Sequence, residues 1–264
     1  MFDNGSIIDL SLTLSEAQAP TWPGDVRFQT HVTSWFRNYE AFGITIPSRG
    51  PFQTHSIHMS DHTGTHCDAP AHFVPPPDSG LPHASPAGHM TVDMIPLTQY
   101  MGYAAVIDTR HAKASDQTNG TITSGMVAEF EERHGRLAPG EIVLFYSQWD
   151  RRYQGGGGYY GPLDIPPIED TWNAPTVECI EFLIERGIKC IGTDGPSIGP
   201  ANDAQPVHVA ALDGGLGIVE GLANLDRLPP RGSYFIFLPL KLGGGTGGPG
   251  RALAYIANEG PGAM

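Results

Sequence analysis

The stretch SGMVAEFEERHGRLAPGEIVLFY, residues 124–146, predicts a helix followed directly by a buried strand. Ser124 can cap a helix that presents Val127 and Phe130 on one face, and Gly135 can end it. Residues 142–146 then form a short apolar run, which is typical of a buried strand. A helix that leads into a buried strand indicates an α/β fold.

A second unit of the same kind follows in residues 173–192. Asn173 can cap a helix that ends at Gly187, and residues 189–192 can form the next strand. The apolar face of this helix would consist of Val177, Ile180 and Ile184. Two helix-then-strand units in succession favour an α/β core.

Other parts of the chain add strands and loops to this core. Apolar and polar residues alternate from Ile8 to Leu14, which predicts a half-buried strand. Apolar runs at residues 104–107 and 233–240 predict two more strands. With 34 glycines and 24 prolines, the chain has too many turn-forming residues for a helical bundle. We therefore predict one α/β domain over residues 1–264, with residues 153–167 as a long surface loop or lid.

Composition limits the partners of the protein. The formal net charge is −13 and the sequence has no run of Lys or Arg, so we expect no nucleic-acid partner. No stretch approaches the roughly 20 apolar residues of a membrane span, so we expect no membrane partner either. The three cysteines, Cys67, Cys179 and Cys190, are odd in number and widely spaced, which does not suggest a disulfide framework. These features predict a soluble cytoplasmic protein.

The histidines are concentrated in one short region. Seven of the 11 lie between His55 and His89, and the densest part is HTGTHCD, residues 62–68. For any one of them, a structural role in the core or on the surface is the simpler interpretation. The combination instead indicates a metal site, and we expect His55 and His58 to pack beside it or to support it.

The spacing within residues 62–68 determines which side chains can share an ion. In an extended chain His62, His66 and Asp68 project to one face. Cys67 projects to the other face, where we expect a packed thiol. A flat strand would hold His62 and His66 roughly 13 Å apart, too far to share one ion with bonds of about 2 Å. The backbone must therefore curl, and Gly64 can allow this through a bulge or a positive φ.

These side chains also define the chemistry. Imidazoles and a carboxylate suit Zn²⁺ or Mn²⁺, and three protein ligands leave positions open for water and substrate. Because bound Zn²⁺ lowers the pKa of its water to about 7, a hydroxide nucleophile would be available at neutral pH. His72 follows Asp68 by four residues, close enough to receive the proton of this water and to deliver it to a leaving nitrogen.

Residues 62–73, HTGTHCDAPAHF, resemble the signature of the cyclase-family metal hydrolases, the family of bacterial kynurenine formamidase and isatin hydrolase. Further agreement, which extends the resemblance over nearly the whole chain, comes from residues 22–25, 192–197, 238–245 and 251–254. The resemblance implies a compact α/β domain of the swivelling β/β/α type, with a mixed sheet and flanking helices. It also implies a homo-oligomer, either a dimer or a tetramer.

The resemblance implies roles for individual residues as well. His72 would be the catalytic acid/base, and Trp22 would contact the substrate. The family has a distant histidine followed twelve residues later by a glutamate, and His208 and Glu220 have that spacing here. Without the resemblance, His208 would be interpreted as structural and Glu220 as a surface charge. The implied ligands of one or two metal ions are His62, His66, Asp68, His208 and Glu220, with Asp68 and Glu220 able to bridge two ions.

Metal-dependent hydrolysis of an amide bond is the function that these features favour. The substrate would be a small aromatic molecule, either an N-formyl anilide or a cyclic amide (lactam). Metal-bound hydroxide would attack its carbonyl, and His72 would protonate the departing nitrogen. Two alternatives stay open: a metal-dependent cyclase or dehydratase of secondary metabolism, and a non-catalytic metal-binding protein.

Two further features bear on the substrate pocket. An aromatic wall could be formed by Trp22, Phe36, Phe52 and Trp149, although a single aromatic residue is more often part of the core. The glycine-rich run of residues 243–248 could bring backbone N–H groups near a developing oxyanion, or could be a plain flexible turn.

Overall fold

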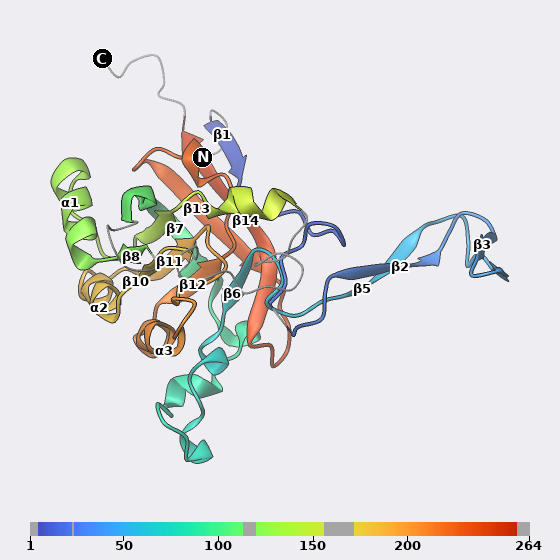
Figure 1. The fold of residues 1–264 in the computed structure, drawn as a ribbon, viewed down its shortest axis with the longest axis horizontal. Helices are drawn as coiled ribbons and strands as arrows, with labels where there is room; N and C mark the ends of the chain where they lie inside the picture. The colour runs from blue at the N-terminus through green and yellow to red at the C-terminus, as the bar shows by residue number, and fades with distance from the viewer. Residues whose placement is uncertain (1–4, 23, 113–119, 156–171, 258–264) are drawn as a thin grey trace.

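The computed structural model describes residues 5–22, 24–112, 120–155 and 172–257. At its centre is a mixed sheet of eight strands in the order β1-β14-β13-β7-β9-β11-β12-β6 (Figure 1). Because β14 also pairs with β6, the sheet closes on itself and resembles a barrel. The strands are β1 (Gly5–Asp9), β6 (His66–Asp68), β7 (Met101–Asp108), β9 (Ile142–Tyr146), β11 (Cys190–Thr193), β12 (Gly217–Glu220), β13 (Ser233–Pro239) and β14 (Gly247–Ala257).

Four neighbouring strands are parallel, and helices connect them. β7, β9, β11 and β12 pair in parallel. The antiparallel pairs include those of β6 with β12 and β14, and of β13 with β7 and β14. The helices are α1 (Ser124–His134), α2 (Val177–Glu185) and α3 (Gln205–Asp213), which lie together on one side of the sheet (Figure 1). A mixed sheet with flanking helices confirms the predicted fold class.

Alternate residues of the central strands face two different apolar layers. On β9, Ile142 and Leu144 belong to the cluster enclosed by the closed sheet, whereas Val143 and Phe145 belong to the cluster that packs under the helices. All five residues of β9 are buried, as expected for a strand that is covered on both faces.

The predicted strands correspond well to the observed ones, with one exception at the N-terminus. Strands were expected at residues 104–107, 142–146, 189–192 and 233–240, where the structure has β7, β9, β11 and β13. The strand expected from Ile8 to Leu14 is shorter, because β1 ends at Asp9 and Ser11 makes an isolated bridge with Leu222.

Both helices begin at a different cap from the one expected. Thr123 caps α1 in place of Ser124, and Thr176 caps α2 in place of Asn173. Each threonine has an extended backbone, and its hydroxyl accepts the backbone N–H three residues further on, which is the geometry of an N-cap. Asn173 instead donates its amide to the carbonyl of Thr109.

Short elements complete the described chain. β8 (Thr121–Ile122) pairs with β10 (Ala174–Pro175). Most of the loop expected over residues 153–167 lies outside the described residues. No described helix has the length and apolar character needed to cross a membrane. The 3-10 helices are η1 (Pro70–His72), η2 (Pro77–Ser79), η3 (Pro86–His89), η4 (Val92–Met94), η5 (Leu97–Tyr100), η6 (Arg110–Ala112), η7 (Trp149–Gly155) and η9 (Leu225–Arg227).

A narrow two-stranded ribbon, which we call the arm, projects from the barrel (Figure 1). β2 (Gln29–Ser34) pairs with β5 (Thr54–His58), and β3 (Tyr39–Ala41) pairs with β4 (Ile44–Ile46). Phe42 and Gly43 connect β3 to β4 with positive φ angles of 54° and 76°, which suit a two-residue hairpin turn. The chain returns from the arm through His58 directly into residues 62–68.

Candidate metal centre

The backbone curls at Gly64, as the sequence predicted. Gly64 has φ of +70°, and the ring centroids of His62 and His66 are 5.1 Å apart. The side chain of Leu14 occupies the space where a Cβ on Gly64 would lie. Cys67 is fully buried in the core, and burial raises the pKa of its thiol to about 12, so the prediction of a packed thiol is also confirmed.

Two overlapping groups of ligand atoms meet at Asp68. Asp68 Oδ1 lies 3.1 Å from His62 Nδ1 and 3.5 Å from His66 Nε2. His66 Nε2 lies 3.5 Å from Glu220 Oε2. Ligand atoms lie within 4.8 Å of one another in each of two groups, His62 with Asp68 and His72, and His66 with Asp68 and Glu220. Because Asp68 belongs to both groups, the geometry offers room for one ion or for two.

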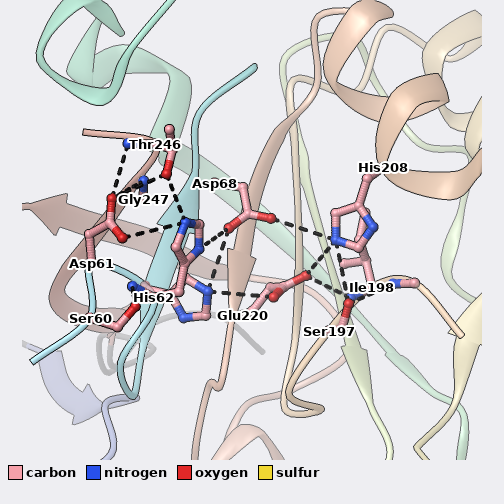
Figure 2. A network of polar contacts seen from close by, with 12 residues as sticks. Ser60, Asp61, His62, Asp68, Ser197, Ile198, His208, Glu220, Thr246 and Gly247 are labelled. Atoms are coloured by element: carbon pink, nitrogen blue, oxygen red, sulfur yellow. Dashed lines mark hydrogen bonds and ion pairs between the residues drawn. The ribbon is translucent and has the colours of Figure 1, made fainter. Parts of the chain in front are cut away.

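His208 reaches this cluster from α3, on the far side of Asp68 and Glu220 (Figure 2). His208 Nε2 lies 3.2 Å from Glu220 Oε1 and 3.6 Å from Asp68 Oδ2. The backbone N–H of Ile198 donates to Glu220 Oε1 at 2.8 Å, which fixes the carboxylate at the end of β12. The structure therefore brings together residues that are more than 150 positions apart in the sequence.

Hydrogen bonds to backbone carbonyls orient two of the imidazoles. His66 Nδ1 lies 2.9 Å from the carbonyl oxygen of Gly64, and His208 Nδ1 lies 2.7 Å from that of Ala204. A carbonyl only accepts, so each Nδ1 carries a proton, and each Nε2 is the ring atom directed toward Asp68 and Glu220.

The buried donor atoms fit a divalent cation. Among the described residues, His66 Nε2 and Asp68 Oδ2 are buried and make no hydrogen bond, although a buried polar atom without a partner is costly. Asp68 and Glu220 are almost fully buried, and both carboxylates lie near the imidazoles of His66 and His208. Imidazoles that give up a proton on binding, combined with buried carboxylates, form the donor set that binds a transition-metal ion.

The cluster perturbs the pKa values of its own members. Burial opposes charge on Asp68, but the nearby imidazoles of His72 and His62 hold the pKa of its carboxyl well below the usual range. Burial likewise opposes charge on His62 and His208, but Asp68 raises the pKa of His62 and Glu220 raises that of His208.

His72 lies at the edge of the cluster and is its most exposed member. It belongs to η1, and its ring stacks on that of His62. Desolvation by the surrounding protein, together with the neighbouring imidazoles, lowers the pKa of His72 to about 4. The next residue, Phe73, stacks on His208 with ring centroids 4.0 Å apart and an interplanar angle of 18°. Phe73 was not among the predicted site residues, although its place directly after His72 was an available signal.

The aromatic residues near Trp22 differ from the expected set. Trp22 and Trp149 each meet Trp172 edge to face, at centroid distances of 5.9 and 5.8 Å. Trp172, which the sequence analysis missed, donates its ring N–H to the carbonyl of Gly199 at 2.8 Å. Phe36 and Phe52 are exposed side chains of the arm region and do not belong to this cluster, so a wall made of all four expected aromatics is wrong.

The glycine-rich run of residues 243–248 already has partners for several of its N–H groups. Those of Thr246 and Gly247 both donate to Asp61 at 3.1 Å, and that of Gly244 donates to Asp93 at 3.1 Å. These three N–H groups are therefore not free to face an oxyanion, as one interpretation of the sequence expected.

Fold and site together define a class of protein: a closed mixed α/β sheet that carries a buried cluster of histidines and carboxylates suited to a metal ion. The family model described as "Putative cyclase" matches residues 8–200. This match covers well over half of the chain, and the chain therefore belongs to the cyclase family.

Individual relatives agree with this assignment. The chain is 31% identical over 216 residues to an isatin hydrolase of Roseibium aggregatum, covering 79% of this chain and 77% of the relative. It is 30% identical over 261 residues to a kynurenine formamidase of Salinibacter ruber, covering 96% and 99%. Among solved structures, isatin hydrolase A from Labrenzia aggregata bound to benzyl benzoate matches with a TM-score of 0.77 and 30% identity, covering 96% and 94%.

Proposed function

We propose that the protein is a metal-dependent amidohydrolase that cleaves an N-formyl anilide or a lactam of a small aromatic substrate. The observation that carries this proposal is the convergence of His62, His66, Asp68 and Glu220 on one buried space, with His72 at its edge. The relatives named kynurenine formamidase and isatin hydrolase, which fit an N-formyl amide and a cyclic amide respectively, support the substrate class.

The ligands that we propose are His62, His66, Asp68, His208 and Glu220. They would hold Zn²⁺ or Mn²⁺, as one ion or as two ions that share Asp68. A cation bound there would polarise a substrate carbonyl and make water more acidic. Elemental analysis of protein purified without chelator identifies the metal and its stoichiometry.

His72 is the residue that we propose moves the proton. Its lowered pKa of about 4 keeps the imidazole neutral at pH 7, so it can accept a proton from the attacking water. The same imidazole then delivers this proton to the nitrogen of the amide, whose C–N bond breaks as the amine leaves. The ring can reach substrate because His72 lies at the exposed edge of the cluster.

We assign contact with the aromatic part of the substrate to Trp22. Its ring is partly buried and meets Trp172 edge to face, within an aromatic cluster whose apolar character suits an aromatic ligand. The ring N–H of Trp172 donates to the carbonyl of Gly199. In the same loop, the backbone N–H of Ile198 donates to the carboxylate of Glu220. This loop connects the aromatic cluster to the proposed metal site.

We also propose that the single domain forms homo-oligomers, dimers or tetramers, through the arm. An isolated two-stranded ribbon is marginally stable in water, and all five residues of β5 are exposed. Half of the 16 exposed large hydrophobic side chains in the described residues lie on or beside the arm. They are Val26, Val32, Trp35, Phe36, Phe42, Ile44, Phe52 and Ile57.

Charge favours a second copy of the chain as the partner of the arm. Residues 26–58 contain three arginines and one glutamate, whereas the whole chain has a net charge of −13. A basic, apolar arm is therefore complementary to the acidic body of another copy.

The three cysteines are free and buried, which supports a reducing compartment such as the cytoplasm.

A substrate panel tests the proposed function. The chain is stripped of metal, reloaded with Zn²⁺ or Mn²⁺, and incubated with N-formylkynurenine and isatin while formate release and ring opening are followed. We expect turnover that depends on the added metal. A metal-loaded protein that is inert toward amides, lactams and lactones alike would contradict the proposal. Water loss or ring closure without net hydrolysis would instead favour a cyclase or dehydratase.

A further inference from the structure

One of the three buried imidazoles is oriented differently from the other two. His66 and His208 are fixed by backbone carbonyls, whereas the outer nitrogen of His62 faces two side chains, Thr246 and Asp61 (Figure 2). A backbone carbonyl persists in every variant, but a side chain can be removed. Of these three imidazoles, His62 is therefore the one whose outer nitrogen is oriented by side chains. Its orientation can change when Thr246 or Asp61 is replaced.

We propose that Asp61, acting through the hydroxyl of Thr246, is a positioning residue that fixes the ring of His62 and thereby sets the affinity of the site for its metal. This inference rests on the proposed function, because it takes the cluster to be a metal site. Asp61 is not one of the proposed ligands. It acts through Thr246 and His62.

The hydrogen bonds form a short relay. His62 Nε2 lies 3.2 Å from Thr246 Oγ1, which lies 3.2 Å from Asp61 Oδ2. A carboxylate only accepts, so the Thr246 hydroxyl donates to Asp61 and keeps a lone pair to accept the Nε2 proton of His62. Asp61 Oδ1, at 3.7 Å from Nε2, adds a negative charge that favours a proton there. On the other side of the ring, His62 Nδ1 donates to Asp68 Oδ1 at 3.1 Å, and Nδ1 is the atom that would bind the cation once this proton has left.

Asp61 is itself held firmly by the start of β14. Its Oδ2 accepts the N–H groups of Thr246 and Gly247, both at 3.1 Å. β14 pairs with β6 at this point, with Gly247 opposite Asp68. The strand pairing that closes the barrel thus also places the relay beside the proposed ligands.

Gly247 leaves no room for the ring of His62 to move. A Cβ at this position would lie 2.6 Å from the carbonyl oxygen of Asp61 and 2.7 Å from His62 Cε1. Both distances are shorter than real carbon contacts, so the glycine packs directly against the imidazole. The relay and this contact together define one ring position.

The test measures metal affinity of the full chain directly, by competition with a chromophoric chelator for Zn²⁺ at one fixed pH. We expect Asp61→Asn and Thr246→Val each to weaken Zn²⁺ binding about 10–100-fold, the usual effect of losing such an outer partner. Thr246→Ser keeps the hydroxyl and is expected to restore wild-type affinity. Asp93→Asn is the matched control, because Asp93 accepts an N–H from Gly244 in the same run but does not contact His62.

Three outcomes would overturn the inference: unchanged affinity in Asp61→Asn, an equal loss in Asp93→Asn, or an equal loss in Thr246→Ser and Thr246→Val. If Asp61→Asn fails to fold, the pair of Thr246 variants still decides. The proposed function fails separately, when wild-type protein binds no metal or turns over no amide. Wild-type protein that binds metal and turns over substrate, with unaltered relay variants, would refute the role of Asp61 alone.

Discussion

The imidazole of His72 stacks on the imidazole of His62, with ring centroids 4.0 Å apart and an interplanar angle of 30°. The residue that we propose transfers the proton thus packs against a proposed metal ligand. The stacking holds the His72 ring in place without using either of its nitrogens, so both remain available for proton transfer.

Replacement of His72 should separate catalysis from metal binding. We expect His72→Ala to retain its metal and to lose about 10²–10⁴-fold in kcat, the usual contribution of a general acid/base. His89→Ala, which removes an exposed histidine of η3, serves as the control and should leave both properties unchanged. Metal content and steady-state kinetics measure the two effects. Loss of metal from His72→Ala would instead make His72 a ligand.

Removal of the metal should make stability depend on pH in a defined direction. The pKa values of His62 and His208 are raised in the folded, metal-free chain, by Asp68 and Glu220 respectively, against the pull of burial. Their contribution to stability is full below the unfolded pKa of about 6.5, and it is lost as the pH rises through the folded values. We therefore expect the Tm of chelator-treated protein to fall as the pH rises above about 6.5.

The metal-loaded protein is the control for that experiment. In the metal-loaded protein, the bound cation neutralises the negative charges of Asp68 and Glu220 in place of the two imidazolium ions. The Tm of this form should therefore fall less over the same pH range. Protons compete for the same imidazole nitrogens, so metal affinity should weaken toward acid pH. A Tm of metal-free protein that rises steadily with pH above 6.5 would contradict the assignment of these charges.

Gly64→Ala should destabilise the protein and distort the metal site. The positive φ costs a residue with a Cβ about 1–2 kcal/mol. Overlap with the Leu14 side chain adds about 1–3 kcal/mol. Gly243→Ala is the control, because a Cβ there meets no atom within 4 Å. Denaturant midpoints and metal affinity measure the effect, and equal stability of the two variants would contradict the role of Gly64.

A charge on the arm should dissociate the proposed oligomer. Ile44 and Ile57 are both 61% exposed, and we expect Ile44→Asp and Ile57→Asp to shift the protein toward monomers in sedimentation velocity. Leu81→Asp, at a site that is 59% exposed but lies off the arm, should leave the assembly intact. A wild-type protein that is monomeric at micromolar concentration would refute the arm as an oligomerisation element.

Local structure followed from the sequence because it depends on neighbouring residues. The apolar run of residues 142–146 predicted β9, and the spacing in residues 62–68 required the curl that Gly64 makes. Both features follow from side-chain period and backbone sterics. The caps were missed because Thr123 and Ser124 are both acceptable cap residues, and only the backbone conformation distinguishes them.

The composition of the candidate site could not be derived in this way. His208 and Glu220 were nominated by resemblance to a family, and Asp61 was not nominated at all. His62 and Thr246 are 184 positions apart, and their hydrogen bond exists because β14 pairs with β6 and closes the sheet. Sequence by itself determined which segments form strands, helices and a bent histidine loop. Only the tertiary structure decided which distant side chains meet, because strand pairing across the closed sheet, and not local conformation, sets those distances.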